Sequence, residues 1–311
     1  MSRFQPAQRL MTKLRILLTG LAGSGKTLSA LRLAWRLAQR EAQHQGRQDN
    51  GVVFVLDSES HRSAVYIGNP WLPPWFTFSV GDIHPPYSHV EYIKAIDEAV
   101  VGGCDVLIID SVTHAWGGQG GLQDTQSRLS KSMGQLSWAE IKPLQRDLMT
   151  KLTTNAATPV HTIVTCRAKP ESKYDPEKGA TVRTGDLVPD FRQNVLEYEF
   201  LLCFHIDRES HIAAPRKDNT GIFDGIQGKR EGIINEMYAD WLFDWYLHGA
   251  ATPPPPSGPS VQAAPQQALP PAQAVPQSTP LLLPPGTAPQ QVPPVGQKSP
   301  PPAIGGLDSL R

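Results

Sequence analysis

The fold is decided by residues 14–31, which read L-R-I-L-L-T-G-L-A-G-S-G-K-T-L-S-A-L. They contain the pattern G-x-x-x-x-G-K-T, from Gly20 to Thr27, which marks a phosphate-binding loop when a strand precedes it and a helix follows it. Both neighbours are present: residues 14–18 are an apolar run typical of a buried strand, and apolar residues recur at helical spacing from Thr27 onward. The stretch therefore predicts a strand, a phosphate-binding loop and a helix in succession.

The residue types of this loop suit a nucleotide. Glycines let the backbone turn tightly and approach an anion, and the N–H groups of the turn and of the helix start then face the phosphates. The Lys26 ammonium can reach the β- and γ-phosphates, and the Thr27 hydroxyl can ligate Mg²⁺. We therefore expect ATP and Mg²⁺ as cofactors; the alternative is a glycine-rich turn that binds nothing. The expected nucleotide contacts are Gly20, Gly23, Ser24, Gly25, Lys26, Thr27 and Leu28.

Composition divides the chain into three parts. Residues 251–311 hold 18 of the 30 prolines and only three charged residues. A segment of this kind buries too little apolar area to offset the entropy of ordering it, so we expect a disordered, polyproline-like tail. The predicted organisation is a leader at 1–12, one ATP-binding domain at 13–250 and the tail at 251–311.

Charge and cysteine usage limit the function classes. The net charge is zero, which excludes a strongly basic surface and leaves only a local patch for nucleic acid. Cys104, Cys166 and Cys203 lie in or beside apolar runs without metal-ligand spacing, so we expect core thiols in a reducing compartment. Neither a signal peptide nor an apolar run of about 18 residues is apparent. We expect a cytoplasmic protein without a membrane partner.

Strand-like and helix-like runs alternate along the domain, which predicts an α/β fold with a largely parallel central sheet flanked by helices. Pro143 should lie in the first turn of its helix or kink it. The expected strands are 14–18, 51–57, 76–80, 105–110 and 160–166, with a later pair at 196–206 and 210–214. The expected helices are 27–43, 88–101, 136–155 and 231–248; 111–134 should be a long loop, and 167–192 a mobile loop or a hairpin.

Two carboxylates stand where strands end. Asp110 closes the apolar run 106–109, and the carboxyl ends of parallel strands are where open α/β sheets bind ligands. With Thr27 it could hold Mg²⁺, the alternative being a carboxylate that caps the next turn. Glu59 follows the strand at 51–57 and could orient and deprotonate the attacking water; otherwise it is a solvated side chain.

Other side chains leave both a functional and a structural interpretation open. Thr165 and Arg167, after the strand at 160–166, could sense the γ-phosphate or simply be strand-end polar groups. The basic turn 216–221, with Lys217, could stabilise charge on a neighbouring subunit's nucleotide, or be an ordinary solvated turn. Trp71 and Trp75 could stack on bases or cover the core.

In these motifs the sequence resembles RecA/RadA-type recombinase ATPases and, more narrowly, phage and prophage AAA-family nucleotide-binding proteins with a RecA-like core, some of which act in single-strand annealing. The resemblance covers about residues 13–230. It is carried by Gly20-x-x-Gly23-x-Gly25-Lys26-Thr27, Asp57-x-Glu59, Leu107-Ile-Ile-Asp110-Ser-Val-Thr-His114-x-Trp116, Trp138 with Pro143, Thr165-x-Arg167 and Leu196-Glu-Tyr-Glu-Phe200.

The resemblance implies a RecA-like sheet, Glu59 as the catalytic glutamate and Asp110 as the metal-site carboxylate. It also implies assembly into a ring or filament with ATP between subunits. Lys217 lies in a turn only similar to the family's trans-acting basic motif. The segments 111–134 and 167–192 would face DNA.

Two functions follow. The first is an ATPase acting on single-stranded DNA in recombination, annealing or repair. Residues 167–192 carry six Lys/Arg against five Asp/Glu, which predicts weak, salt-sensitive binding, with Tyr174 and Phe191 available to stack on bases. The alternative is a nucleotide-dependent switch or loader that organises a protein assembly without touching DNA, for which the proline-rich tail would dock a partner. A small-molecule kinase is weaker, because no basic lid motif is present.

Overall fold

The computed structural model describes residues 9–176, 179–191, 195–225 and 228–248. They lie in the first of two units, Met1–Pro255; the second is Pro256–Arg311. The predicted tail, and the predicted leader up to residue 8, lie outside the described residues. Within the described part, no helix combines the length and apolar character that a membrane crossing requires.

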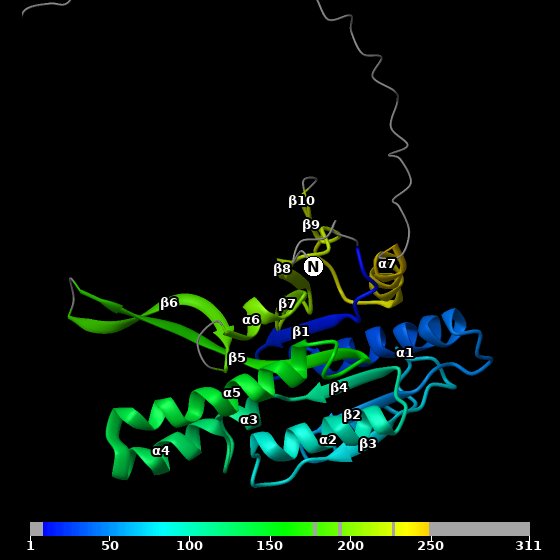
Figure 1. Ribbon diagram of the computed structural model, residues 1–311. Helices are drawn as coiled ribbons and strands as arrows, with labels where there is room; N and C mark the ends of the chain where they lie inside the picture. Colours follow the sequence, from blue (N-terminus) through cyan, green and yellow to red (C-terminus); the bar gives the residue numbers. More distant parts are fainter. Residues whose placement is uncertain (1–8, 177–178, 192–194, 226–227, 249–311) are drawn as a thin grey trace, which may run out of the picture. The chain divides into compact units, whose positions relative to one another are not determined.

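The centre of the fold is a sheet of order β3-β2-β4-β5-β1-β7-β8 (Figure 1). All neighbours from β3 to β7 pair in parallel, and β8 is antiparallel to β7. The strands are β1 Arg15–Gly20, β2 Val53–Asp57, β3 Ser79–Asp82, β4 Val106–Asp110, β5 His161–Asp175, β6 Ala180–Pro189, β7 Leu202–Ile206 and β8 Ala213–Asp218. A small separate ribbon joins β9 Asp224–Gly225 to β10 Gly228–Lys229. The predicted α/β fold with a largely parallel sheet is confirmed.

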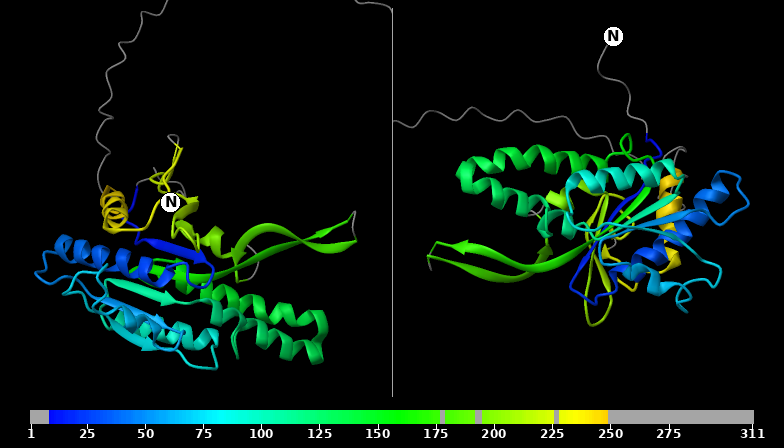
Figure 2. Two further views of the ribbon diagram at one scale, coloured as in Figure 1. Left: turned by 180° about the vertical axis from the view of Figure 1, so that it is seen from behind. Right: turned by 90° about the horizontal axis from the view of Figure 1, so that it is seen from below.

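Helices cover both faces of this sheet (Figures 1 and 2). They are α1 Lys26–His44, α2 His89–Val101, α3 Thr113–Gly117, α4 Leu122–Met133, α5 Ser137–Thr153, α6 Val195–Glu199 and α7 Glu236–Leu247, with 3₁₀ turns η1 Arg62–Tyr66 and η2 Gly134–Leu136. Ser88 caps the N-terminus of α2, because its hydroxyl accepts a hydrogen bond from the Glu91 N–H at 3.3 Å.

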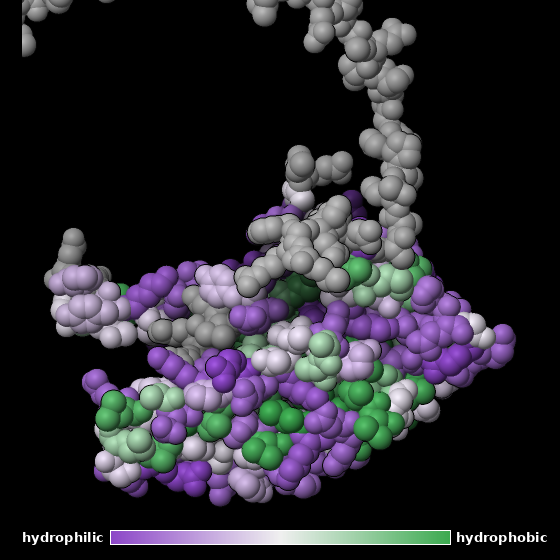
Figure 3. Space-filling view, viewed as in Figure 1, coloured by the Kyte–Doolittle hydropathy of each residue, from purple (hydrophilic) through white to green (hydrophobic). Residues whose placement is uncertain are grey.

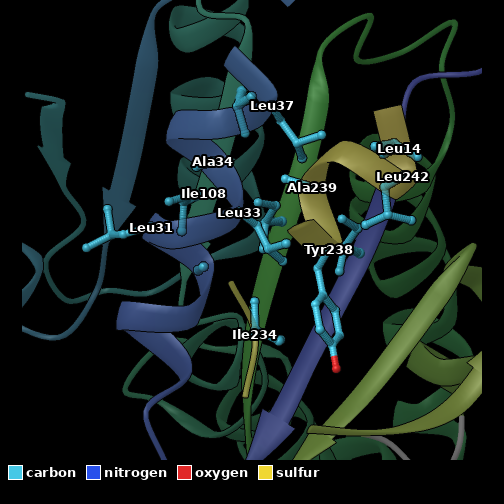
Figure 4. Close-up of a cluster of buried hydrophobic side chains, with 14 of the residues drawn as sticks. Leu14, Leu31, Leu33, Ala34, Leu37, Ile108, Ile234, Tyr238, Ala239 and Leu242 are labelled. Atoms are coloured by element: carbon cyan, nitrogen blue, oxygen red, sulfur yellow. The ribbon is translucent and has the colours of Figure 1, made fainter. Parts of the chain in front are cut away.

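Two hydrophobic clusters share the central strand β1. Successive side chains of a strand point to opposite faces. Ile16 and Leu18 accordingly join the cluster under α1 and α7, whereas Leu17 joins the cluster under α2 and α5. Figure 4 shows side chains of α1 and α7 meeting over the sheet. The strand that leads into the phosphate-binding loop is thus buried on both faces.

The segment 111–134, predicted as one long loop, is mostly helical. It forms α3 and α4, and α4 packs against α5. Trp116 stacks on Trp138 with ring centroids 6.2 Å apart, and the Gln126 amide donates to the Ser137 hydroxyl at 3.0 Å. Of the residues of α4, only Leu122 is fully buried, so the helix carries little of the apolar periodicity from which a helix is predicted.

The structure also decides three other sequence-based expectations. Pro143 lies inside α5, beyond its first turn. The strand predicted at 196–206 begins only at Leu202, because Val195–Glu199 forms the short helix α6. Of the two alternatives for 167–192, the hairpin is confirmed: β5 continues to Asp175 and pairs antiparallel with β6. The hairpin projects well beyond the sheet (Figures 1 and 2).

Candidate active site

The predicted site residues gather where the parallel strands end. Gly20 at the end of β1 pairs with Arg167 of β5, and Asp57 at the end of β2 pairs with Asp110 of β4. Since all these strands run in one direction, their carboxyl ends lie at one edge of the sheet. The phosphate-binding loop leaves β1 at this edge and enters α1.

The loop has a backbone that requires glycine. Gly23 and Gly25 have φ of 81° and 89°, in the left-handed region that residues with a Cβ avoid. A Cβ at Gly20 would lie 2.6 Å from the Ile206 carbonyl oxygen. The Ser24 hydroxyl is buried without a hydrogen-bond partner among the described residues, an unsatisfied group that phosphate oxygens would satisfy.

Lys26 is folded back onto the loop. Its Nζ donates to the Gly20 carbonyl at 3.0 Å and to the Leu21 carbonyl at 2.8 Å. Burial lowers the pKa of Lys26, and the nearby Asp110 carboxylate opposes that shift. Leu28, the last predicted nucleotide contact, lies in the first turn of α1, and its side chain packs against the core cluster.

Asp110 is the buried acceptor for two threonines. Thr27 donates to Asp110 Oδ2 at 2.6 Å, and Thr165 donates to Oδ1. The residue is 4% exposed, and burial raises the pKa of its carboxyl group. A carboxylate beside a hydroxyl is a hard oxygen donor set that fits Mg²⁺, an ion that keeps waters and shares substrate phosphates. Thr27 and Asp110 would hold it together with the nucleotide's phosphate oxygens. Among the described residues, no three or more His, Cys, Asp or Glu side chains form a metal-binding cluster.

Glu59 faces the same space and is paired with Arg167. The Arg167 Nη2 lies 2.6 Å from both carboxylate oxygens, and its Nε lies 3.1 Å from Oε1. The side chain of Glu59 is 13% exposed and that of Arg167 is 43% exposed. Asp57 supports this corner, because its carboxylate accepts from the Glu59 and Ser63 N–H groups. A carboxylate that could act as a base is thus held by an arginine at the root of the hairpin.

These groups surround one cavity of about 120 Å³, room for a few water-sized groups rather than for a whole nucleotide. Its lining is Ala22, Gly23, Lys26, Thr27, Glu59, Arg62, Asp110, Ser111 and Arg167. The predicted catalytic and metal-binding residues Glu59, Lys26, Thr27 and Asp110 all line it, and Thr165 touches it through Asp110. Their roles in catalysis stay predictions.

Lys217 is not part of this constellation. It lies on β8, and its Nζ donates to the Tyr198 carbonyl of α6. A role on a neighbouring subunit's nucleotide stays a prediction. Trp75 packs edge-on against Trp35 of α1 with centroids 5.6 Å apart, and the Arg32 guanidinium lies 5.7 Å from the Trp71 ring centroid. These contacts favour the packing interpretation of both tryptophans.

Phe191, predicted as a base-stacking residue, is 1% exposed and packs against Trp116 with ring centroids 5.2 Å apart. That prediction is wrong, because a ring in the core cannot receive a base without unfolding its surroundings. Tyr174 on β5 is 66% exposed and remains available.

Two residues beside the phosphate-binding loop escaped the sequence-based prediction. Arg208 and His211 belong to the turn between β7 and β8, and His211 Nδ1 lies 3.0 Å from the Ser24 carbonyl oxygen. No sequence motif identifies Arg208 and His211 as site residues, because their position beside the loop depends on the pairing of β7 with β1. The only sequence signal is Asp207, three residues before Ser210, a spacing typical of a side chain that caps a turn.

The comparisons with known proteins agree with this geometry. A family model described as AAA domain matches residues 12–223, more than half of the chain and all of the cavity lining. No curated protein matches the chain.

Proposed function

The chain belongs to the AAA-domain family of P-loop nucleotide-binding proteins, and on that premise we propose that it is a RecA-like ATPase, of the phage or mobile-element kind, whose turnover responds to single-stranded DNA. The observation that carries the proposal is the Glu59–Arg167 pair. It joins the predicted base to the root of a projecting hairpin.

The hydrolytic step uses groups that line one cavity. The glycine-rich loop and Lys26 would bind the phosphates, and Thr27 and Asp110 would hold Mg²⁺, which neutralises phosphate charge when bound. Glu59 would orient a water molecule and accept its proton as the water oxygen bonds to the γ-phosphorus. The bond from that phosphorus to the bridging oxygen of ADP breaks, giving ADP and phosphate.

Arg167 links the hairpin to the hydrolytic step through its ion pair with Glu59. While the guanidinium binds both oxygens of Glu59, the carboxylate is a poorer base for water. The Arg167 backbone N–H donates to the Thr113 hydroxyl at 2.9 Å, and β5 continues from Thr165 to Asp175 with a register shift between Pro170 and Ser172. Because the Arg167 side chain is 43% exposed, a ligand on the hairpin that draws the guanidinium away would release Glu59.

Two lysines that the hairpin could offer to DNA are already paired with carboxylates. Lys169 pairs with Asp190 at 2.9 Å, and Lys173 pairs with Glu171 at 3.0 Å. Phosphates would have to displace these carboxylates, so binding should be weak and should fall steeply with salt. Exposed Tyr174 would add a stacking platform.

Because these lysines are paired, the described part of the hairpin leaves few free positive charges for DNA. This favours the second candidate, a switch that organises a protein assembly. Figure 3 shows apolar residues scattered among hydrophilic ones on the face that carries α2 and α4. Val101 and Leu136, at the end of α2 and between α4 and α5, are 88% and 71% exposed. Scattered apolar residues are normal on a surface, so they support this candidate less than the hairpin supports the first.

Steady-state ATP hydrolysis with and without single-stranded DNA, across a salt series, separates the two functions. We expect stimulation that fades as salt rises, and no turnover in the Lys26→Ala blank. Tyr174→Ala should lose stimulation, whereas Tyr198→Ala, a matched exposed tyrosine on α6 (75% exposed), should keep it. Turnover indifferent to DNA would favour the assembly switch.

Self-assembly into a ring or filament is the second part of the proposal. If Lys217 acts on a neighbour's nucleotide, mixing Lys217→Ala chains with Lys26→Ala chains should restore part of the turnover that each lacks alone. Failure of the mixture to exceed the sum of its components would remove the trans role of Lys217.

A further inference from the structure

We propose that the turn between β7 and β8, residues 207–212, binds the nucleoside end of the nucleotide, with Arg208 against the base and His211 beside the loop that holds the phosphates. The inference rests on the proposed nucleotide site and extends it from the phosphates to the part of the ligand that distinguishes one nucleotide from another.

The turn lies directly against the phosphate-binding loop. The Ser24 carbonyl can only accept a hydrogen bond, so the proton of the contact lies on His211 Nδ1, which is 3.0 Å away. In the neutral ring, Nε2 then keeps a lone pair for a ligand hydroxyl or amine. A Cβ placed on Gly25 would lie 3.5 Å from His211 Nδ1, and one on Gly23 would lie 4.0 Å from Arg208 Nε.

The turn is held in one shape by its own hydrogen bonds. The Asp207 carboxylate accepts from the Ser210 N–H at 2.8 Å and from the Ser210 hydroxyl at 2.7 Å. The Asp207 N–H donates to the Ile212 carbonyl at 2.9 Å. These contacts hold His211 at a φ of 57°, a left-handed conformation that is unfavourable for a residue with a Cβ. Strained backbone of this kind is a reason to look for function, and here it directs an imidazole at the loop.

The direction of the nucleotide follows from the order of the strands. Glu59, which follows β2, and Arg167 on β5 face the proposed γ-phosphate, and both strands lie on one side of β1. β7 and β8 lie on the other side. A triphosphate laid across the loop with its terminal phosphate toward Arg167 therefore directs its nucleoside toward the turn 207–212.

The side chains of the turn suit a nucleoside. Arg208 and His211 are exposed, so both can reach a ligand above the loop. A planar guanidinium stacks on an aromatic base in a way that a lysine ammonium cannot reproduce. The imidazole supplies an acceptor within reach of a sugar hydroxyl or an exocyclic amine.

The test compares ATP with inorganic tripolyphosphate, which carries the phosphates without a nucleoside. Equilibrium binding of each, with Mg²⁺, is measured for the full chain by titration calorimetry. We expect Arg208→Ala and Arg208→Lys to weaken ATP binding about tenfold and to leave tripolyphosphate binding within about twofold of the parent chain. His211→Ala should also weaken ATP more than tripolyphosphate, and Arg146→Ala, an exposed arginine on α5 (side chain 75% exposed), should change neither.

The opposite outcomes are distinct. Equal weakening of both ligands would mean that the turn shapes the loop or touches phosphate, and unchanged ATP binding would mean that it touches nothing; either overturns the inference. Arg208→Lys with parental ATP affinity would remove the stacking role. A parent chain that binds tripolyphosphate but gains nothing from the nucleoside overturns this inference alone. A parent chain that binds neither ligand overturns the proposed function with it.

Discussion

Glu59 is the single residue on which the proposed chemistry depends, because its carboxylate is the candidate base and Arg167 holds both of its oxygens. Glu59→Gln keeps the shape and removes the basicity. We expect kcat for ATP to fall by about 10²–10⁴, with the Kd for ATP nearly unchanged, as measured by single-turnover hydrolysis beside equilibrium binding. Glu91→Gln, an exposed glutamate on α2, is the control. Parental kcat in the Glu59 variant would place the base elsewhere.

A second residue-scale consequence concerns pH. His161 is fully buried, accepts the Leu14 N–H on Nδ1 and therefore donates from Nε2 to Glu41 as a neutral ring. Burial alone would raise the pKa of Glu41, but the hydrogen bonds from His161 and Lys13 outweigh it and lower that pKa to about 2. Burial lowers the pKa of His161.

Both shifts make acidification destabilising. The unfolded chain gains a proton on histidine below about pH 6.5. It gains one on glutamate below about pH 4.5, whereas folded Glu41 stays ionised down to about pH 2. We expect Glu41 alone to contribute about 3 kcal/mol at neutral pH, lost from about pH 5 to about pH 2. Thermal unfolding against pH should show a shallower loss for Glu41→Gln than for the parent chain or for Glu98→Gln. Parallel curves would contradict the assignment.

At this scale the sequence predicted most of the site. Lys26, Thr27, Asp110 and Glu59 line one cavity because each follows a buried strand, and the ends of parallel strands must meet. Arg208 and His211 could not be predicted, since they reach the loop only through the pairing of β7 with β1, about 180 residues apart in the chain.

Among the elements, α4 shows where patterning fails. Gly118, Gly120 and Gly121 precede its first residue, and Leu122 is its only fully buried residue. Residues 111–134 therefore have the composition of a loop. The helix is stabilised by packing against α5, which is tertiary information. By contrast, α1 and β4 bury enough apolar residues for their sequence patterns to predict a helix and a strand.

Pro143 gives an element-scale prediction. It lies exposed inside α5, where its ring removes one backbone hydrogen bond and crowds the preceding turn. Pro143→Ala should therefore raise the free energy of unfolding by about 1–3 kcal/mol, seen as a higher Tm. Lys142→Ala, at the exposed position beside it, should change Tm little. A Pro143→Ala variant with a lower Tm would show that the proline ring is needed for packing.

At the scale of the whole molecule, the described residues, which end at 248, already form two hydrophobic clusters. Each cluster buries one face of the sheet, and β1 belongs to both. A chain ending at residue 250 should therefore keep a single cooperative unfolding transition and the ATPase activity of the full chain. Calorimetry and hydrolysis assays on the two chains check this. A broad or absent transition in the shorter chain would show that residues 251–311 complete the fold.

The three buried thiols have a further consequence, for kinetics. Cys104 lies just before β4, Cys166 lies in β5 and Cys203 lies in β7. Burial raises the pKa of each thiol to about 12. Almost no thiolate is present at neutral pH, so an alkylating reagent can react only after the surrounding strand opens. The alkylation rate of each cysteine, measured by mass spectrometry, therefore reports how often the structure around that cysteine opens. Cys166 lies beside Thr113 at the root of the hairpin. We expect its alkylation rate to fall most when nucleotide is added.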